Sequence, residues 1–110
     1  MLKVTDENFE TEIKNYSGNA LLEFYSDSCI PCKRMSPVLA EIDEKYTEIK
    51  TAKYNVNTDS EIAKEYKILA SPTIIFFKGG EEKSRRRGIV KKDEIEEIIK
   101  EVFENESTTS

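Results

Sequence analysis

The sequence contains no histidine, and only two of its 110 residues are cysteine. Structural zinc is held by four ligands, mainly thiolates and imidazoles. Two cysteines supply half of such a site, so carboxylates or a second subunit would have to complete it. A metal centre is therefore a weak interpretation of the cysteine pair, and we expect no metal.

Long apolar segments and an excess of positive charge are also absent. No stretch approaches the roughly 20 apolar residues that span a bilayer, and the net charge of −5 argues against nucleic-acid binding. We therefore expect neither a membrane nor a nucleic acid as a partner. The first ten residues, MLKVTDENFE, have no apolar run after a basic start. This pattern predicts no signal peptide and a cytoplasmic protein.

Both cysteines lie in the segment SDSCIPCKRMSP, residues 26–37. A Cys29–Cys32 bridge closes a loop of four residues, which stabilises a fold by only about 2 kcal/mol before strain is subtracted. A chain of this length also buries roughly two-thirds of its unfolded surface without such a staple. A C-x-x-C pair can instead cycle between dithiol and disulfide, and in the cytoplasm a catalytic pair is commoner than a structural one. The spacing favours a chemical reagent.

Apolar periodicity predicts alternating strands and helices in a single domain, residues 1–105, followed by a frayed polar tail at 106–110. The run ALLEFY (20–25) is typical of a strand buried on both faces, and KGGEE (78–82) predicts a hairpin. The strands are expected at 2–4, 20–25, 49–57, 73–77 and 83–89, and the helices after Thr5 or Asp6 and at 32–46, 59–67 and 95–103. The order βαβαβαββα predicts an α/β fold, with a mixed sheet of about five strands flanked by about four helices.

With this order, the sequence resembles the thioredoxin family over nearly its whole length. The motifs are LLEFYSDSCIPCK (21–33), Pro37, SPT (71–73), FFKGG (76–80) and Gly88, at the separations usual in that family. The resemblance implies a thioredoxin fold and a protein-disulfide reductase that cycles Cys29 and Cys32 between dithiol and disulfide. It also implies disulfide-containing protein substrates, a thioredoxin reductase-like flavoprotein that uses NADPH, no bound cofactor, and a monomer.

The resemblance also assigns roles. Cys29 is the nucleophile, because a helix N-terminus favours its thiolate, and Cys32 is the resolving thiol. Glu23 is the one charge inside ALLEFY; if buried, its pKa rises and it accepts the proton of Cys32, whereas on a solvated face it has no such role. Lys53 matches the lysine that partners this carboxylate, or is an exposed strand residue. Pro72 matches a cis-proline that faces the cysteines.

The lip of the cysteine site is expected to contact the substrate. The residues concerned are Ser28, Ile30, Pro31, Ser71, Arg87 and Gly88. Ser28 and Ile30 replace the tryptophan and glycine usual in the family, and Ser71 replaces an aliphatic residue. Tyr25 stands where a second tryptophan is common, and Glu23 where aspartate is usual. These differences leave the chemistry in place and raise an alternative, an electron donor dedicated to one enzyme system.

The basic segment KSRRR (83–87) has two interpretations. Charged side chains protect an edge strand against pairing with other chains. Alternatively, arginines next to Gly88 lie near the cysteines in this fold and attract an acidic partner. A third function, a docking module without a redox cycle, needs neither the cysteine pair nor Pro72 nor a buried acid, and is therefore disfavoured.

Overall fold

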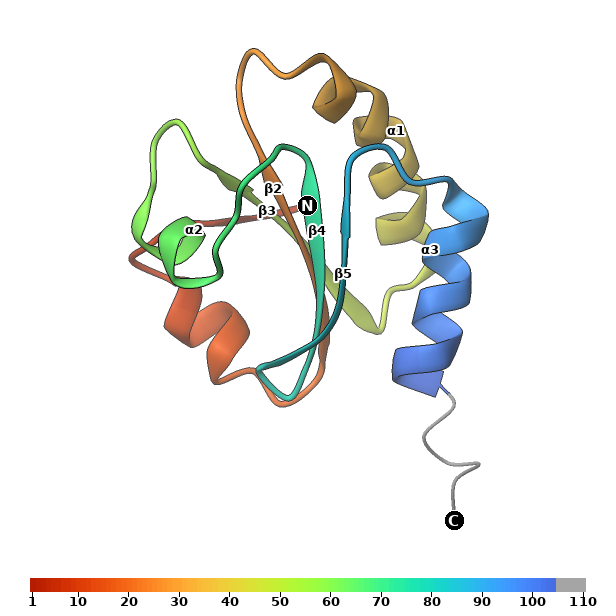
Figure 1. Ribbon diagram of the computed structural model, residues 1–110. Helices are drawn as coiled ribbons and strands as arrows, with labels where there is room; N and C mark the ends of the chain where they lie inside the picture. Colours follow the sequence, from red (N-terminus) through yellow and green to blue (C-terminus); the bar gives the residue numbers. More distant parts are fainter. Residues whose placement is uncertain (105–110) are drawn as a thin grey trace.

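The computed structural model describes residues 1–104 (Figure 1). The elements are β1 (Leu2–Val4), η1 (Glu10–Lys14), β2 (Asn19–Tyr25), α1 (Ile30–Lys45), β3 (Ile49–Asn55), α2 (Glu61–Glu65), β4 (Thr73–Lys78), β5 (Glu81–Arg87), α3 (Lys92–Ile99) and η2 (Lys100–Glu104). The two η segments are π-helical turns. This order confirms the predicted alternation, although α2 is shorter than the helix predicted at 59–67. The tail predicted at 106–110 lies outside the described residues.

The strands form one mixed sheet in the order β1-β3-β2-β4-β5. Strands β1, β3 and β2 run parallel, whereas β4 is antiparallel to β2 and β5 is antiparallel to β4. Gly79 and Gly80 form the β4–β5 turn with φ of +59° and +84°, a region that glycine adopts readily. The predicted hairpin and five-stranded mixed sheet are therefore confirmed, and β5 is an edge strand. Among residues 1–104, no helix is both long and apolar enough to cross a bilayer.

Helices cover both faces of the sheet (Figure 1). Side chains alternate along β2, so Leu21 packs with α1 and α3, while Leu22 and Phe24 pack with η1 and α2. All three side chains are fully buried, which explains why the run ALLEFY is nearly continuous in apolar character. Glu23 shares the face of Leu21 and is therefore placed under the first turns of α1.

Asp6 connects the N-terminal segment to the start of α2. Its Oδ1 accepts hydrogen bonds from the Tyr54 hydroxyl at 2.7 Å and the Ile62 N–H at 3.0 Å, and its Oδ2 accepts from the N–H groups of Ser60 and Glu61, both at 3.1 Å. Burial alone would raise the pKa of Asp6, but these hydrogen bonds outweigh it and lower the pKa below its usual value. The carboxylate thus acts as an N-cap supplied from a distant part of the chain.

Replacing Asp6 by alanine should lower the free energy of unfolding by roughly 2–4 kcal/mol, because the buried Tyr54 hydroxyl and the first turn of α2 both lose their acceptor. Since the pKa of Asp6 is lowered in the folded state, the contribution is present at neutral pH and is lost as pH falls below about 4. Urea denaturation at pH 7 and pH 3 measures both effects. The control is Glu7→Ala at an exposed neighbour; equal losses in the two variants would contradict the capping role.

Candidate active site

The two cysteines lie where the chain leaves β2 and enters α1. They form a disulfide with Cα atoms 5.2 Å apart, so the site is in its oxidised form. Cys29 is the N-cap residue of α1, and its Sγ accepts a hydrogen bond from the N–H of Cys32 at 3.1 Å. Pro31 occupies the first turn, where no N–H donor is needed. Cys29 is half-buried, whereas Cys32 is only 5% exposed. The more exposed sulfur, that of Cys29, is therefore the one that accepts a hydrogen bond from a backbone N–H of α1.

Two backbone segments, one at Ser71–Pro72 and one at Gly88, meet near Cys29. The Ser71–Pro72 peptide bond is cis, as predicted. The carbonyl oxygen of Ser71 lies 3.5 Å from the Cys29 Sγ, and the carbonyl oxygen of Pro72 accepts a hydrogen bond from the Gly88 N–H at 2.8 Å. The structure thus brings the predicted residues Ser71, Pro72 and Gly88 together, with Ser71 next to the reactive sulfur. The predicted contact Ile30 lies on the exposed side of the same site.

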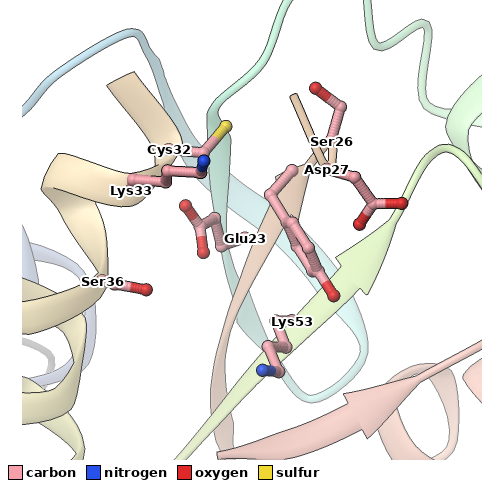
Figure 2. Close-up of a pocket in the computed structure, with 8 residues that line it drawn as sticks. Glu23, Ser26, Asp27, Cys32, Lys33, Ser36 and Lys53 are labelled. Atoms are coloured by element: carbon pink, nitrogen blue, oxygen red, sulfur yellow. The ribbon is translucent and has the colours of Figure 1, made fainter. Parts of the chain in front are cut away.

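Glu23 is buried, with 3% of its surface exposed, so the prediction of burial is confirmed and the solvated alternative is wrong. Figure 2 shows its carboxylate beneath Cys32. The Oε2 atom has no hydrogen-bond partner among the described residues. Burial raises the pKa of Glu23 from 4.5 to about 7, although the charge of Lys53 acts in the opposite direction. This carboxyl group therefore exchanges protons near neutral pH.

Lys53 lies opposite Glu23 in the register of β2 and β3 and lines the same pocket. The two side chains form no ion pair within 4 Å among the described residues; instead the Lys53 ammonium lies 5.8 Å from the centre of the Tyr25 ring. Lys53 is therefore a partner of Glu23 through long-range attraction, not through a direct contact. Because the two groups form no direct ion pair, burial dominates the pKa of Glu23.

A pocket of about 190 Å³ connects Glu23 with the surface beside α1 (Figure 2). It is lined by Glu23, Tyr25, Ser26, Asp27, Cys32, Lys33, Ser36 and Lys53. A water molecule takes up about 30 Å³ in the liquid, so several fit between these polar side chains. Four of these residues, Ser26, Asp27, Lys33 and Ser36, were not predicted as site residues, although Ser36 lies four residues after Cys32, on the same side of the helix. The pocket gives Glu23 a polar route for protons.

The thioredoxin family model matches residues 1–101. This chain belongs to the thioredoxin family. It is 33% identical to the thioredoxin of Rickettsia bellii over 97 residues, which cover 87% of this chain and 92% of that protein. The thioredoxin of Acidithiobacillus ferridurans is 31% identical over 96 residues (86% and 89%), and that of Mycobacterium bovis is 38% identical over 81 residues (73% and 70%).

Family membership and the close cysteine pair together define the activity. The matched region, residues 1–101, contains the Cys29–Cys32 disulfide and the mixed five-stranded sheet. Members of the thioredoxin family are protein-disulfide oxidoreductases. The chain is therefore a thiol–disulfide oxidoreductase with the thioredoxin fold, as the resemblance implied.

The arginines of this thioredoxin-family chain differ in their environment. Arg85 makes two hydrogen bonds to Glu82 and a third to the carbonyl oxygen of Tyr66 at 2.9 Å. Arg86 pairs with Glu94 at 3.0 Å. Arg87 is exposed and has no ion pair or hydrogen bond from its side chain in the described part of the chain. The interpretation of KSRRR as edge protection thus suits Arg85 and Arg86, whereas Arg87 remains available to a partner.

Proposed function

We propose that this chain reduces protein disulfides, with Cys29 as the nucleophile and Cys32 as the resolving thiol. This assignment rests on the different surroundings of the two sulfur atoms. Cys29 caps α1, receives a backbone N–H and lies beside Ser71, whereas Cys32 is buried above Glu23. A helix N-terminus stabilises a thiolate, and the thiolate is the attacking species in disulfide exchange.

In the first step, the Cys29 thiolate attacks one sulfur of the substrate disulfide. A bond forms between Cys29 and that sulfur, and the second substrate sulfur leaves as a thiolate, which takes up a proton. An extended substrate segment lies along the backbone of Ser71 and Pro72. Ser28, Ile30, Pro31, Arg87 and Gly88 form the surrounding contact surface.

In the second step, Cys32 resolves the mixed disulfide. Glu23 accepts the Cys32 proton, directly or through water in the pocket, and the new thiolate attacks the sulfur of Cys29. The substrate's remaining sulfur leaves as a thiolate and is protonated. The substrate has then gained two electrons and two protons, and the chain holds the Cys29–Cys32 disulfide. Lys53 tunes this step by its charge, which limits the rise in the pKa of Glu23.

Regeneration of the dithiol requires two electrons from outside the chain. The family relationship supports a thioredoxin reductase-like flavoprotein that draws them from NADPH, so the chain itself needs no bound cofactor. We further infer that it works in the cytoplasm as a monomer and carries electrons between this reductase and protein substrates.

The assignment of the two thiols is tested by alkylation of the reduced protein. Cys29 should react first, with an apparent pKa below the roughly 8.5 of a free thiol, and Cys32 should react slowly because it is buried. Mass spectrometry of partly alkylated protein across pH measures both rates. Preferential labelling of Cys32 would reverse the assignment.

The reductase activity itself is tested by two measurements. The chain should turn over a protein disulfide with NADPH and a flavoprotein reductase, and its reduction potential should lie near the roughly −270 mV of thioredoxin.

A further inference from the structure

Two of the four arginines, Arg34 and Arg87, have no side-chain hydrogen bond or ion pair among residues 1–104. Arg87 lies directly before Gly88, whose N–H binds the carbonyl oxygen of Pro72. Pro72 follows Ser71, which lies against the Cys29 sulfur. Arg87 therefore belongs to a backbone segment that is linked to the Cys29 sulfur through two contacts, Gly88 with Pro72 and Ser71 with Cys29.

Arg34 occupies the opposite flank of α1 from the Glu23 pocket. Ser36 and Lys33 line that pocket, and Met35 points into the core. Because a helix turns by about 100° per residue, Arg34 projects to the other side of Met35 from Ser36. The loop after β5 packs there, since the Val90 N–H lies 3.3 Å from the Met35 sulfur. Arg34 thus lies on the side of the cysteines away from Glu23, next to the loop that follows Arg87 and Gly88.

Exposed apolar side chains accompany the two arginines. Ile30 is 65% exposed and precedes Arg34 by one helical turn, and Ile89 is 56% exposed and follows Gly88. We call Ile30, Arg34, Arg87 and Ile89 the Cys29 rim. Its apolar residues can cover a substrate segment, while its two cations remain without a counter-ion in the described structure.

The charge of the rim contrasts with that of the whole molecule, which carries a net charge of −5. The two arginines earlier in β5 are instead paired with carboxylates, Arg85 with Glu82 and Arg86 with Glu94. Lys91, near the rim, lines a shallow pocket with several acidic side chains, so it adds little positive charge. An unpaired guanidinium binds carboxylates with two parallel hydrogen bonds, a geometry that gives both attraction and orientation.

We infer that the Cys29 rim selects disulfides flanked by aspartate or glutamate in the partner protein. This inference rests on the proposed reductase function and adds the class of substrate. Arg34 and Arg87 attract the flanking carboxylates and hold them while Ile30 and Ile89 cover the chain near the disulfide. The rim raises the rate of encounter with acidic partners and leaves the exchange chemistry at Cys29 unchanged.

Three synthetic disulfide-bonded peptides test the inference. They share one sequence except at four positions beside the disulfide, which carry aspartate and glutamate, the corresponding amides, or lysine. The reduced chain should react with the acidic peptide about tenfold faster than with the amide peptide at low ionic strength. This preference should vanish in 1 M salt, where the Debye length is about 3 Å instead of about 10 Å at 0.1 M. Equal rates for the acidic and amide peptides at low salt would overturn the inference.

Charge reversal locates the effect. Arg34→Glu and Arg87→Glu should each remove most of the preference for the acidic peptide, and the double variant should prefer the lysine peptide. The matched control is Lys14→Glu, which changes the net charge equally at an exposed residue beside the β4–β5 turn, at the other end of the sheet. Loss of the preference in Lys14→Glu to the same extent would overturn the role of the rim.

A neutral small-molecule disulfide separates this inference from the proposed function. If the unmodified chain reduces the neutral disulfide but does not prefer the acidic peptide, only the selectivity inference fails. If it reduces neither the neutral disulfide nor any peptide, the proposed function fails as well. Reduction of the neutral disulfide together with an acidic preference that depends on both arginines supports the inference.

Discussion

Replacing Cys29 by serine should abolish the reduction of protein disulfides, lowering kcat/KM by roughly a thousandfold or more. A serine hydroxyl is not ionised near neutral pH, so the helix N-terminus that favours the Cys29 thiolate has no comparable nucleophile to stabilise. The buried Cys32 cannot replace it, because only 5% of its surface is accessible to a substrate. Turnover of a protein disulfide with an external reductase measures the loss.

Cys32→Ser should behave differently, because it leaves the attacking sulfur in place. This variant should form the mixed disulfide through Cys29 and then stop, since no second thiol displaces the bound substrate. Intact-mass measurement should show one substrate molecule per chain, released by an added small thiol. The parallel Cys29→Ser sample should show no adduct. An adduct on Cys29→Ser, together with continued turnover by Cys32→Ser, would exchange the proposed roles of the two cysteines.

The fold and the reactive pair follow from local patterns that the sequence displays directly. The continuous apolar run around Leu21 and Leu22 predicts a central strand because both faces of β2 are covered by helices. The same run identifies Glu23 as exceptional, since a charge inside a doubly covered strand has no solvated face. The position of Cys29 at a helix start follows from the strand before it and from Pro31 after it. These inferences need only neighbours along the chain.

The remaining features depend on contacts between distant segments, which a single sequence does not specify. Arg85, Arg86 and Arg87 are consecutive and chemically identical, yet the first two are neutralised and the third is not. Their pairing depends on where Glu82 and Glu94 lie once β5 and α3 have packed. Asp6 likewise became the cap of α2 only because the fold brings it to residues 60–62.

The environment of Glu23 shows the same limit. The sequence favours burial of this carboxylate, and the family resemblance implies that Lys53 is its partner; the structure places Lys53 on the neighbouring strand β3. The sequence does not reveal that the ammonium group lies near the Tyr25 ring, nor that a polar pocket reaches the carboxylate. Burial raises the pKa of Glu23 and the charge of Lys53 limits the rise, so both together determine whether Glu23 exchanges protons near neutral pH.

Glu23→Gln should increase the free energy of unfolding by about 3 kcal/mol at pH 8 and leave it almost unchanged at pH 4. The pKa of Glu23 is about 7 in the folded chain and about 4.5 when unfolded. Below pH 4.5 the carboxyl group is protonated in both states and costs nothing. Between pH 4.5 and 7 the folded state binds more protons, so stability falls as pH rises. Above pH 7 the cost is constant, and 2.5 pKa units at 1.36 kcal/mol each correspond to about 3 kcal/mol.

The same variant should slow the second chemical step more than the first. Glutamine cannot accept the Cys32 proton, so resolution of the mixed disulfide at pH 7 should slow on the order of a hundredfold, whereas its formation by Cys29 should change little. Rapid-mixing kinetics of the two steps, combined with urea denaturation across pH, measure both effects in one set of samples.

Glu48→Gln, at an exposed residue, is the matched control and should alter neither the rate of resolution nor the free energy of unfolding. A stabilised Glu23→Gln variant that resolves the mixed disulfide at the normal rate would show that Glu23 is a buried acid without a catalytic role. Cys32 would then have to lose its proton to water in the pocket.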